Sequence, residues 1–210
     1  MPASHTLLVF ALVAAAFVAA PGPSNLYVLT RGLQSGSRAA VAGAAGCATG
    51  AYVYVIATAV GLSALLASSQ LVFAAIHYAG AAYLLWLGIT ALRSHAPDLP
   101  RAAPGPRSIW RSYRQGALVE LGNPKVALFF LALFPQFIRE GAGPAWLQAL
   151  IFGTIFVSLG FASDSLYAVG SGRLRALLVR RPRLRRGQHK ATGVLYLGLG
   201  GWAVASGSSD

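Results

Sequence analysis

The sequence is poor in charged residues. They make up 10% of the 210 residues, whereas hydrophobic residues make up 56%. A soluble globular domain carries about 25% charged residues, so a soluble fold of this size would lack a polar surface. Six apolar stretches of the chain are long enough for the roughly 20 residues that a helix needs to cross a bilayer. We therefore expect an all-α membrane protein whose residues 1–210 form a single transmembrane domain.

Residues that carry redox, metal or nucleotide chemistry are also scarce. Cys47 is the only cysteine, so no internal disulfide can form, and no CxxC pair or Cys/His cluster suggests a metal site. The sequence contains no GxxxxGK[ST] motif, no HExxH pair and no serine elbow. These absences argue against ATP hydrolysis, a metal centre, an intramembrane protease and a thiol relay. We expect no cofactor and no catalytic residue.

Acidic residues are few as well, since 5 Asp and Glu stand against 17 Lys and Arg, for a net charge of +12. In a soluble protein this excess would suggest nucleic acid as a partner, so the distribution of the charges has to decide. The apolar stretches predict helices near residues 6–31, 39–67, 71–92, 112–138, 145–170 and 190–206.

The loops between these helices differ strongly in charge. The first loop, with Arg31 and Arg38, and the third and fifth loops together hold 15 of the 17 basic residues. Cytoplasmic loops of membrane proteins collect Lys and Arg. The basic charge therefore predicts topology and not nucleic-acid binding, and it places both termini on the extracytoplasmic side.

The basic stretch Arg173–Gln188 allows two interpretations. Its interleaved leucines would suit an interfacial helix attracted to anionic lipid headgroups. Pro182 and the density of Arg interrupt a long amphipathic face, so we favour a solvated cytoplasmic loop.

The first apolar stretch also has features of a signal peptide. Leu7–Ala20 has the length of the apolar core of a signal peptide, but no Lys or Arg precedes this segment. Apolar sequence resumes at Leu26–Leu33, so we expect a spanning helix instead.

Prolines divide the chain into two halves. Ser94–Arg111 contains four prolines and is typical of a linker, here a cytoplasmic one at 94–111 between residues 1–93 and 112–210. Each half has three predicted helices, and because three is odd the halves would sit in opposite orientations. Pro21-Gly22-Pro23 interrupts the first helix of one half, and Asn123-Pro124 interrupts the first helix of the other. This pattern predicts two inverted three-helix repeats with the substrate site at the interruptions.

The two interruptions supply candidate binding groups. Pro21, Gly22 and Pro23 free backbone groups at membrane depth, and Ser24 or Asn25 can cap the helix that resumes.

At the second interruption, Asn123 suits an N-cap and Pro124 the first helical position, so a half-helix is expected to begin there. The partial positive charge of its N-terminus and the ammonium of Lys125 would together suit a carboxylate.

Three ionisable residues fall inside predicted spans: Glu120, Lys125 and Asp164. An intramembrane charge costs at least a few kcal/mol, so it is usually paired or functional. Glu120 and Lys125 can neutralise each other, or Glu120 can contact the substrate. Asp164 has no basic residue nearby in the sequence, and we expect it to be an unpaired carboxylate that binds an ammonium or carries a proton, with Glu120 as the second candidate for proton coupling.

Several of these motifs together resemble the lysine exporter and homoserine/threonine exporter (LysE/RhtB) family of amino-acid efflux permeases. The first similar segment is Pro21–Leu26, followed by Arg31-Gly32-Leu33. The second runs from Arg114-Gln115-Gly116 through Asn123-Pro124-Lys125 to Phe134–Phe137. The third is Asp164 with Tyr167 and Gly172-Arg173-Leu174. Two positions depart from the family pattern: Ser24 stands where Asn or Asp is frequent, and Glu120 where a neutral amide is expected. The extra acid would favour a cationic ligand or offset Lys125.

The resemblance implies a six-helix protein of the bacterial inner membrane that exports amino acids or close derivatives by proton antiport. Its partners would be the small-molecule substrate and the lipid bilayer, and a homo-oligomer is compatible with the sequence. The alternatives are a metal-ion exporter, which the lack of a ligand cluster weakens, and an intramembrane enzyme.

Overall fold

A computed structural model of the chain describes residues 2–66 and 108–180, and isolated positions between 78 and 93 and between 190 and 204. Every regular element in this part of the chain is helical. The elements are α1 (Ser4–Ala19), α2 (Pro23–Ser35), α3 (Ser37–Leu66), α5 (Ile109–Leu121), α6 (Pro124–Leu128), a π-helical turn (Phe129–Leu133), a 3-10 turn (Phe134–Phe137) and α7 (Ala145–Arg180).

Two of these helices are long and apolar enough to span a bilayer without a break, namely α3 over Ser37–Gly61 and α7 over Ala145–Ser171. Two more candidate spans are bent pairs of helices. One pair is α1 with α2. The other is α5 with the segment Pro124–Phe137, which contains α6 and the two turns that follow it. The predicted third and sixth helices, 71–92 and 190–206, lie almost wholly outside the described residues. The all-helical membrane architecture is confirmed for the part that is described, whereas the inverted repeat stays a prediction.

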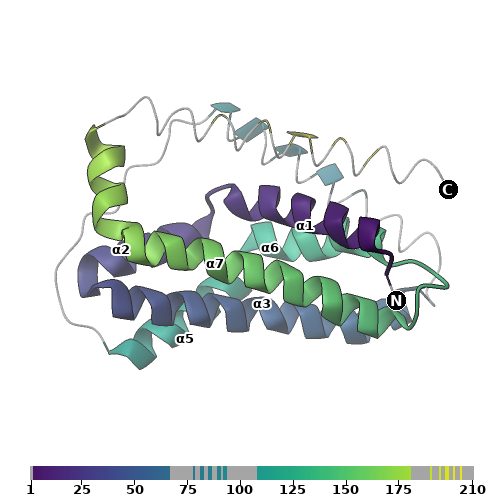
Figure 1. The fold of residues 1–210 in the computed structure, drawn as a ribbon. Helices are drawn as coiled ribbons and strands as arrows, with labels where there is room; N and C mark the ends of the chain where they lie inside the picture. The colour runs from purple at the N-terminus through teal and green to yellow at the C-terminus, as the bar shows by residue number, and fades with distance from the viewer. Residues whose placement is uncertain are drawn as a thin grey trace.

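Both predicted interruptions are confirmed. The axes of α1 and α2 meet at 54°, and those of α5 and of Pro124–Phe137 meet at 46°. Pro23 and Pro124 each occupy the first turn of the helix that follows the break, where the missing N–H would have no intrahelical partner. Figure 1 shows each broken pair in the same bundle as α3 and the long part of α7, which turns sharply only near its C-terminal end.

Glycine allows α3 to pack directly on the backbone of α5. A Cβ placed on Gly46 would lie 1.9 Å from the carbonyl oxygen of Tyr113, and one on Gly116 would lie 2.1 Å from that of Gly43. Small residues of this kind let membrane helices approach closely. The contact fixes α5, and therefore the break that follows it, against an unbroken helix.

Phenylalanine side chains form the core around α1, α6 and α7. Phe10 packs against the rings of Phe137 and Phe152 at centroid distances of 5.0 and 4.7 Å. Phe129 packs against Phe17 and Phe156 at 4.7 and 4.4 Å. Because these rings come from α1, α7 and the segment after the second break, they hold both interruptions against α7.

Two predicted loop boundaries are wrong. The first helical segment continues to Ser35, so Arg31 is part of α2 and is buried instead of lying in a loop. At the other end, α7 continues to Arg180, so the start of the stretch Arg173–Gln188 is helical and not a loop. In both places the helix runs past the apolar segment, because polar residues such as Arg and Gln have good helix propensity and interrupt only the hydropathy pattern.

Candidate functional site between the two helix breaks

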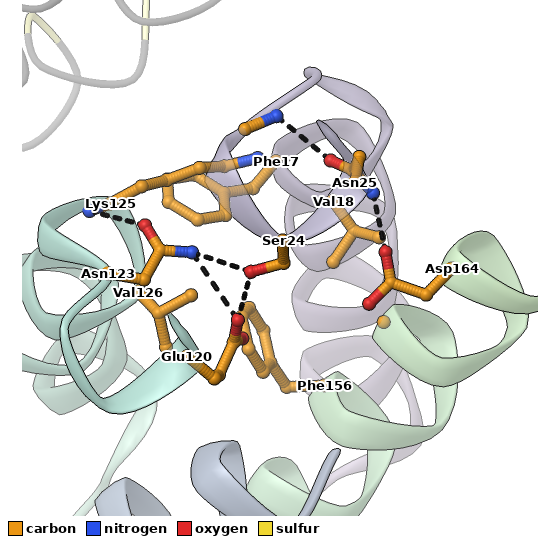
Figure 2. A pocket seen from close by; sticks show the side chains of 12 residues that line it. Phe17, Val18, Ser24, Asn25, Glu120, Asn123, Lys125, Val126, Phe156 and Asp164 are labelled. Atoms are coloured by element: carbon orange, nitrogen blue, oxygen red, sulfur yellow. Dashed lines mark hydrogen bonds between the residues drawn. The ribbon is translucent and has the colours of Figure 1, made fainter. Parts of the chain in front are cut away.

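A cavity lies where the two breaks meet α7 (Figure 2). Its polar lining consists of Gly22, Ser24, Asn25, Glu120, Asn123, Lys125 and Asp164. These residues come from α2, from the end of α5, from the start of α6 and from the middle of α7. The chain segments that supply them are far apart in sequence, so only the folded bundle creates the site.

Asn25 connects the first break to α7. Its side-chain oxygen accepts the N–H of Gly22 at 2.9 Å, which satisfies a backbone donor at the start of α2. Its amide nitrogen donates to Oδ1 of Asp164 at 2.8 Å. The expectation that Asn25 helps to cap α2 is confirmed. Asp164, which we expected to be an unpaired carboxylate, accepts its hydrogen bond from a neutral amide. Asn25 lies 139 positions away in sequence, so the local sequence around Asp164 gives no sign of it.

Ser24 connects the first break to the second. Its hydroxyl donates to Oε2 of Glu120, and it accepts a hydrogen bond from the side-chain amide of Asn123 at 2.9 Å. Ser24 therefore contacts the opposite break instead of capping α2. Glu120 also accepts from Asn123, at 3.4 Å. The carboxylate is thus fixed by two neutral donors.

Asn123 also performs its predicted role as a cap. Its side-chain oxygen accepts the N–H of Lys125 at 3.1 Å, at the N-terminus of α6. One side chain therefore caps the start of α6 and holds Ser24 and Glu120 in place.

Lys125 reaches from the second break to the first. Its ammonium donates to the carbonyl oxygen of Ala20, at the end of α1, and lies 4.8 Å from the centre of the Phe17 ring. A cation at the C-terminal end of a helix stabilises carbonyls that have no intrahelical partner. The alkyl chain of Lys125 passes Gly22, where an added Cβ would lie 3.1 Å from Cδ.

Apolar side chains complete the wall of the cavity: Phe17, Val18, Val126 and Phe156. Figure 2 shows Glu120 and Asp164 on opposite sides of Ser24 and Asn25, with the phenyl rings nearby. The cavity has a volume of about 40 Å³. That is room for a few water molecules, since each needs about 10–15 Å³ by this measure. An amino acid would require the surrounding helices to separate.

The structure brings seven of the ten predicted site residues together around this cavity. Pro21, Pro23 and Pro124 do not line it; they shape the backbone at the two breaks. The sequence interpretation missed the four apolar residues of the wall and Gly160. A membrane helix contains many apolar residues, and hydropathy does not identify those that face a cavity.

No group of three or more His, Cys, Asp or Glu that could hold a metal ion occurs within the described residues. Glu120 and Asp164 approach the cavity together with a lysine and amide groups. Neutral amides and an ammonium suit a polar organic molecule better than a bare metal ion.

Comparisons with known proteins find similarity over nearly the whole chain. The family described as LysE type translocator matches residues 15–207. The chain is 35% identical, over 86% of each protein, to the homoserine/homoserine lactone efflux protein of Salmonella typhimurium. It is 33% identical to an uncharacterized membrane protein of Vibrio cholerae, over 93% of this chain and 95% of that one. It is also 28% identical, over 87% of each protein, to the leucine efflux protein of Enterobacter sp. (strain 638).

No solved structure matches the chain. The family match and the relatives nevertheless confirm that it is a multi-pass membrane transporter and not an enzyme. The chain belongs to the LysE-type translocator family.

Proposed function

We propose that the chain exports an amino acid, or a close derivative such as a lactone, from the cytoplasm. The observation that supports this most directly is the cavity at the two helix breaks, which is lined by an ammonium, Lys125, and by two carboxylates, Glu120 and Asp164. A zwitterion has the complementary pair of charges. The efflux proteins named for homoserine, homoserine lactone and leucine support the same class of substrate.

Each end of the substrate would have its own partners. The carboxylate would bind near Lys125 and the N-terminus of α2, where backbone N–H groups and the helix dipole favour an anion. The ammonium would bind between Glu120 and Asp164. Pro21, Gly22, Pro23 and Pro124 would position these groups through the breaks, whereas Asn25 and Asn123 would orient the two carboxylates.

The apolar wall indicates the kind of substrate side chain. Phe17 and Phe156 face the cavity together with two valines. Burial of an apolar side chain against them is worth about 0.8 kcal/mol for each buried CH₂, whereas a second charge there would lose its hydration without a partner. A neutral amino acid fits this wall better than a basic one.

Charge balance supports proton antiport. Two carboxylates and one ammonium line the cavity, so the fully ionised empty site would carry one excess negative charge, which burial disfavours. A proton on Asp164 or Glu120 removes the excess. The ammonium of the substrate would bind the same carboxylates, while the substrate carboxylate would pair with Lys125. Competition between the proton and the ammonium for the same carboxylates would couple export to proton entry.

The small cavity suggests how the site would alternate between the two sides. In the present arrangement it holds only water-sized ligands, so loading would require α2 or the second broken helix to move away from α7. Two inverted repeats, 1–93 and 112–210, would allow such a movement toward either side. The same proposal places the chain in the bacterial inner membrane with both termini outside.

An efflux panel tests the proposed function. Cells that express the chain are loaded with single amino acids, including homoserine, leucine and lysine, and efflux is followed against cells with an empty vector. We expect faster efflux of neutral members and little effect on lysine. If no amino acid leaves faster than in the control, the proposed function is wrong.

A further inference from the structure

Arg31 is a buried cation outside the cavity. It lies in α2 and its side chain is 4% exposed. Its Nη2 donates to the side-chain oxygen of Gln115 on α5, and the guanidinium carbon lies 5.3 Å from the centre of the Tyr27 ring. Its Nη1 is buried and has no hydrogen-bond partner among the described residues.

A guanidinium in this environment is only partly satisfied. A buried donor without a partner costs about 1–3 kcal/mol, and more when the group is charged. Gln115 supplies one neutral oxygen to a group whose planar donors match the two oxygens of a carboxylate. Arg31 therefore presents paired donors that suit a carboxylate better than the single oxygen of Gln115.

Arg31 lies on the same side of α2 as the cavity residue Ser24. The two are seven residues apart, which is two helical turns and about 10 Å. Three side-chain contacts join α2 to α5 along this side. Ser24 meets Glu120 at the cavity, the hydroxyl of Tyr27 donates to the carbonyl oxygen of Ser112 at 2.6 Å, and Arg31 meets Gln115.

We call this row of contacts the α2–α5 seam. It differs from the contact of α3 with α5, where glycines bring the two backbones together. Side-chain hydrogen bonds can be exchanged for bonds to a ligand as two helices separate, whereas backbone packing has no such replacement. The seam begins at the cavity and ends near the C-terminus of α2, which the proposed topology places at the cytoplasmic side.

We propose that Arg31 is a second carboxylate-binding residue, which takes the carboxylate of an amino acid entering along the α2–α5 seam in exchange for Gln115. This inference rests on the proposed function. The substrate then passes from Arg31 to the cavity, where Ser24 lies about two helical turns away along α2 and Lys125 takes over the carboxylate. Nη1, which has no partner within the described part of the chain, provides the second bond that Gln115 does not supply.

Transport into everted membrane vesicles, which expose the cytoplasmic face, tests this inference. The KM is measured for a transported amino acid and for its carboxamide, which lacks the carboxylate charge. In Arg31→Gln we expect the KM of the amino acid to rise about tenfold or more, because a hydrogen bond to a charged group is lost. The KM of the carboxamide should change less than twofold. Arg38→Gln removes an exposed charge near the same end of α2 and should change neither KM.

A second variant, Arg31→Lys, tests the same inference if Arg31→Gln is not recovered from the membrane. Lysine keeps the charge but lacks the fork of donors, so the preference for the carboxylate should fall by about threefold or more. The preference is a ratio of two KM values and does not depend on the amount of protein. If a recovered variant keeps the wild-type ratio of the two KM values, or if both variants are lost from the membrane, Arg31 has a structural role. Either result overturns this inference and leaves the proposed function in place. If the wild type carries no amino acid, the proposed function fails and the inference fails with it.

Discussion

Ser24 and Glu120, which come from the two different helix breaks, are in direct contact. The hydroxyl of Ser24 donates to the carboxylate of Glu120. An aspartate in place of Ser24 would face that carboxylate with a like charge, whereas a neutral amide in place of Glu120 would need no such donor. A hydroxyl at position 24 therefore suits an acid at position 120.

Asp164→Asn should abolish proton-driven efflux while the protein remains folded. The amide oxygen of asparagine can still accept the hydrogen bond from Asn25, so the link between α2 and α7 is kept and only the proton site is lost. Efflux against an imposed pH gradient should fall to the empty-vector level, with normal amounts of protein in the membrane. Exchange of substrate without a gradient should persist at a reduced rate.

Glu140→Gln is the matched control for Asp164→Asn, since Glu140 is an exposed carboxylate outside the cavity. Its efflux should equal that of the wild type. If Asp164→Asn still exports in proportion to the proton gradient, Asp164 is not the coupling residue, and Glu120 becomes the next candidate.

At the scale of single helices, breaks and caps can be predicted from the sequence because they depend only on residues close by in the chain. The two breaks and the cap at Asn123 follow from proline and asparagine chemistry within a few positions, and the structure confirms them. Arg31 was assigned to a loop because its charge ends an apolar run, although α2 continues beyond it. Its partner Gln115 lies 84 positions away, so a contact between helices, and not local sequence, makes its burial possible.

The contact of α3 with α5 should not tolerate a methyl group. In Gly46→Ala the new Cβ would lie 1.9 Å from the carbonyl oxygen of Tyr113, so the two backbones must separate. Overpacking of this kind typically costs about 1–3 kcal/mol. We expect a lower melting temperature in mild detergent, by about 2–4 °C for each kcal/mol.

Gly61→Ala provides the control in the same helix, because no atom of the described residues lies within 4 Å of the added Cβ. Its melting temperature should equal or slightly exceed that of the wild type, since alanine has the better helix propensity. Equal stability of Gly46→Ala and the wild type would mean that α3 and α5 do not meet backbone to backbone.

At the scale of the whole molecule, the seam and the cavity form one continuous row of polar groups. Arg31, Tyr27 and Ser24 lie along α2 and contact α5, and Asn25 continues the row to Asp164 on α7. The Phe core joins α1, the two turns after α6, and α7. The described part of the bundle thus has a polar seam on one side of the cavity and an aromatic core on the other. We therefore expect the seam to open when substrate is loaded and the aromatic core to stay closed.

That direction of loading requires both termini to lie outside the cytoplasm. The basic residues predict this, and the burial of Arg31 removes only one of the 15 that the sequence assigned to a single side. Alkaline phosphatase folds only outside the cytoplasm, so its fusions to either terminus should be active, whereas a fusion within residues 94–111 should be inactive. A fluorescent protein that folds only in the cytoplasm should give the opposite pattern at the same three positions. An active phosphatase within residues 94–111 would reverse the topology, and the α2–α5 seam would then be an exit and not an entrance.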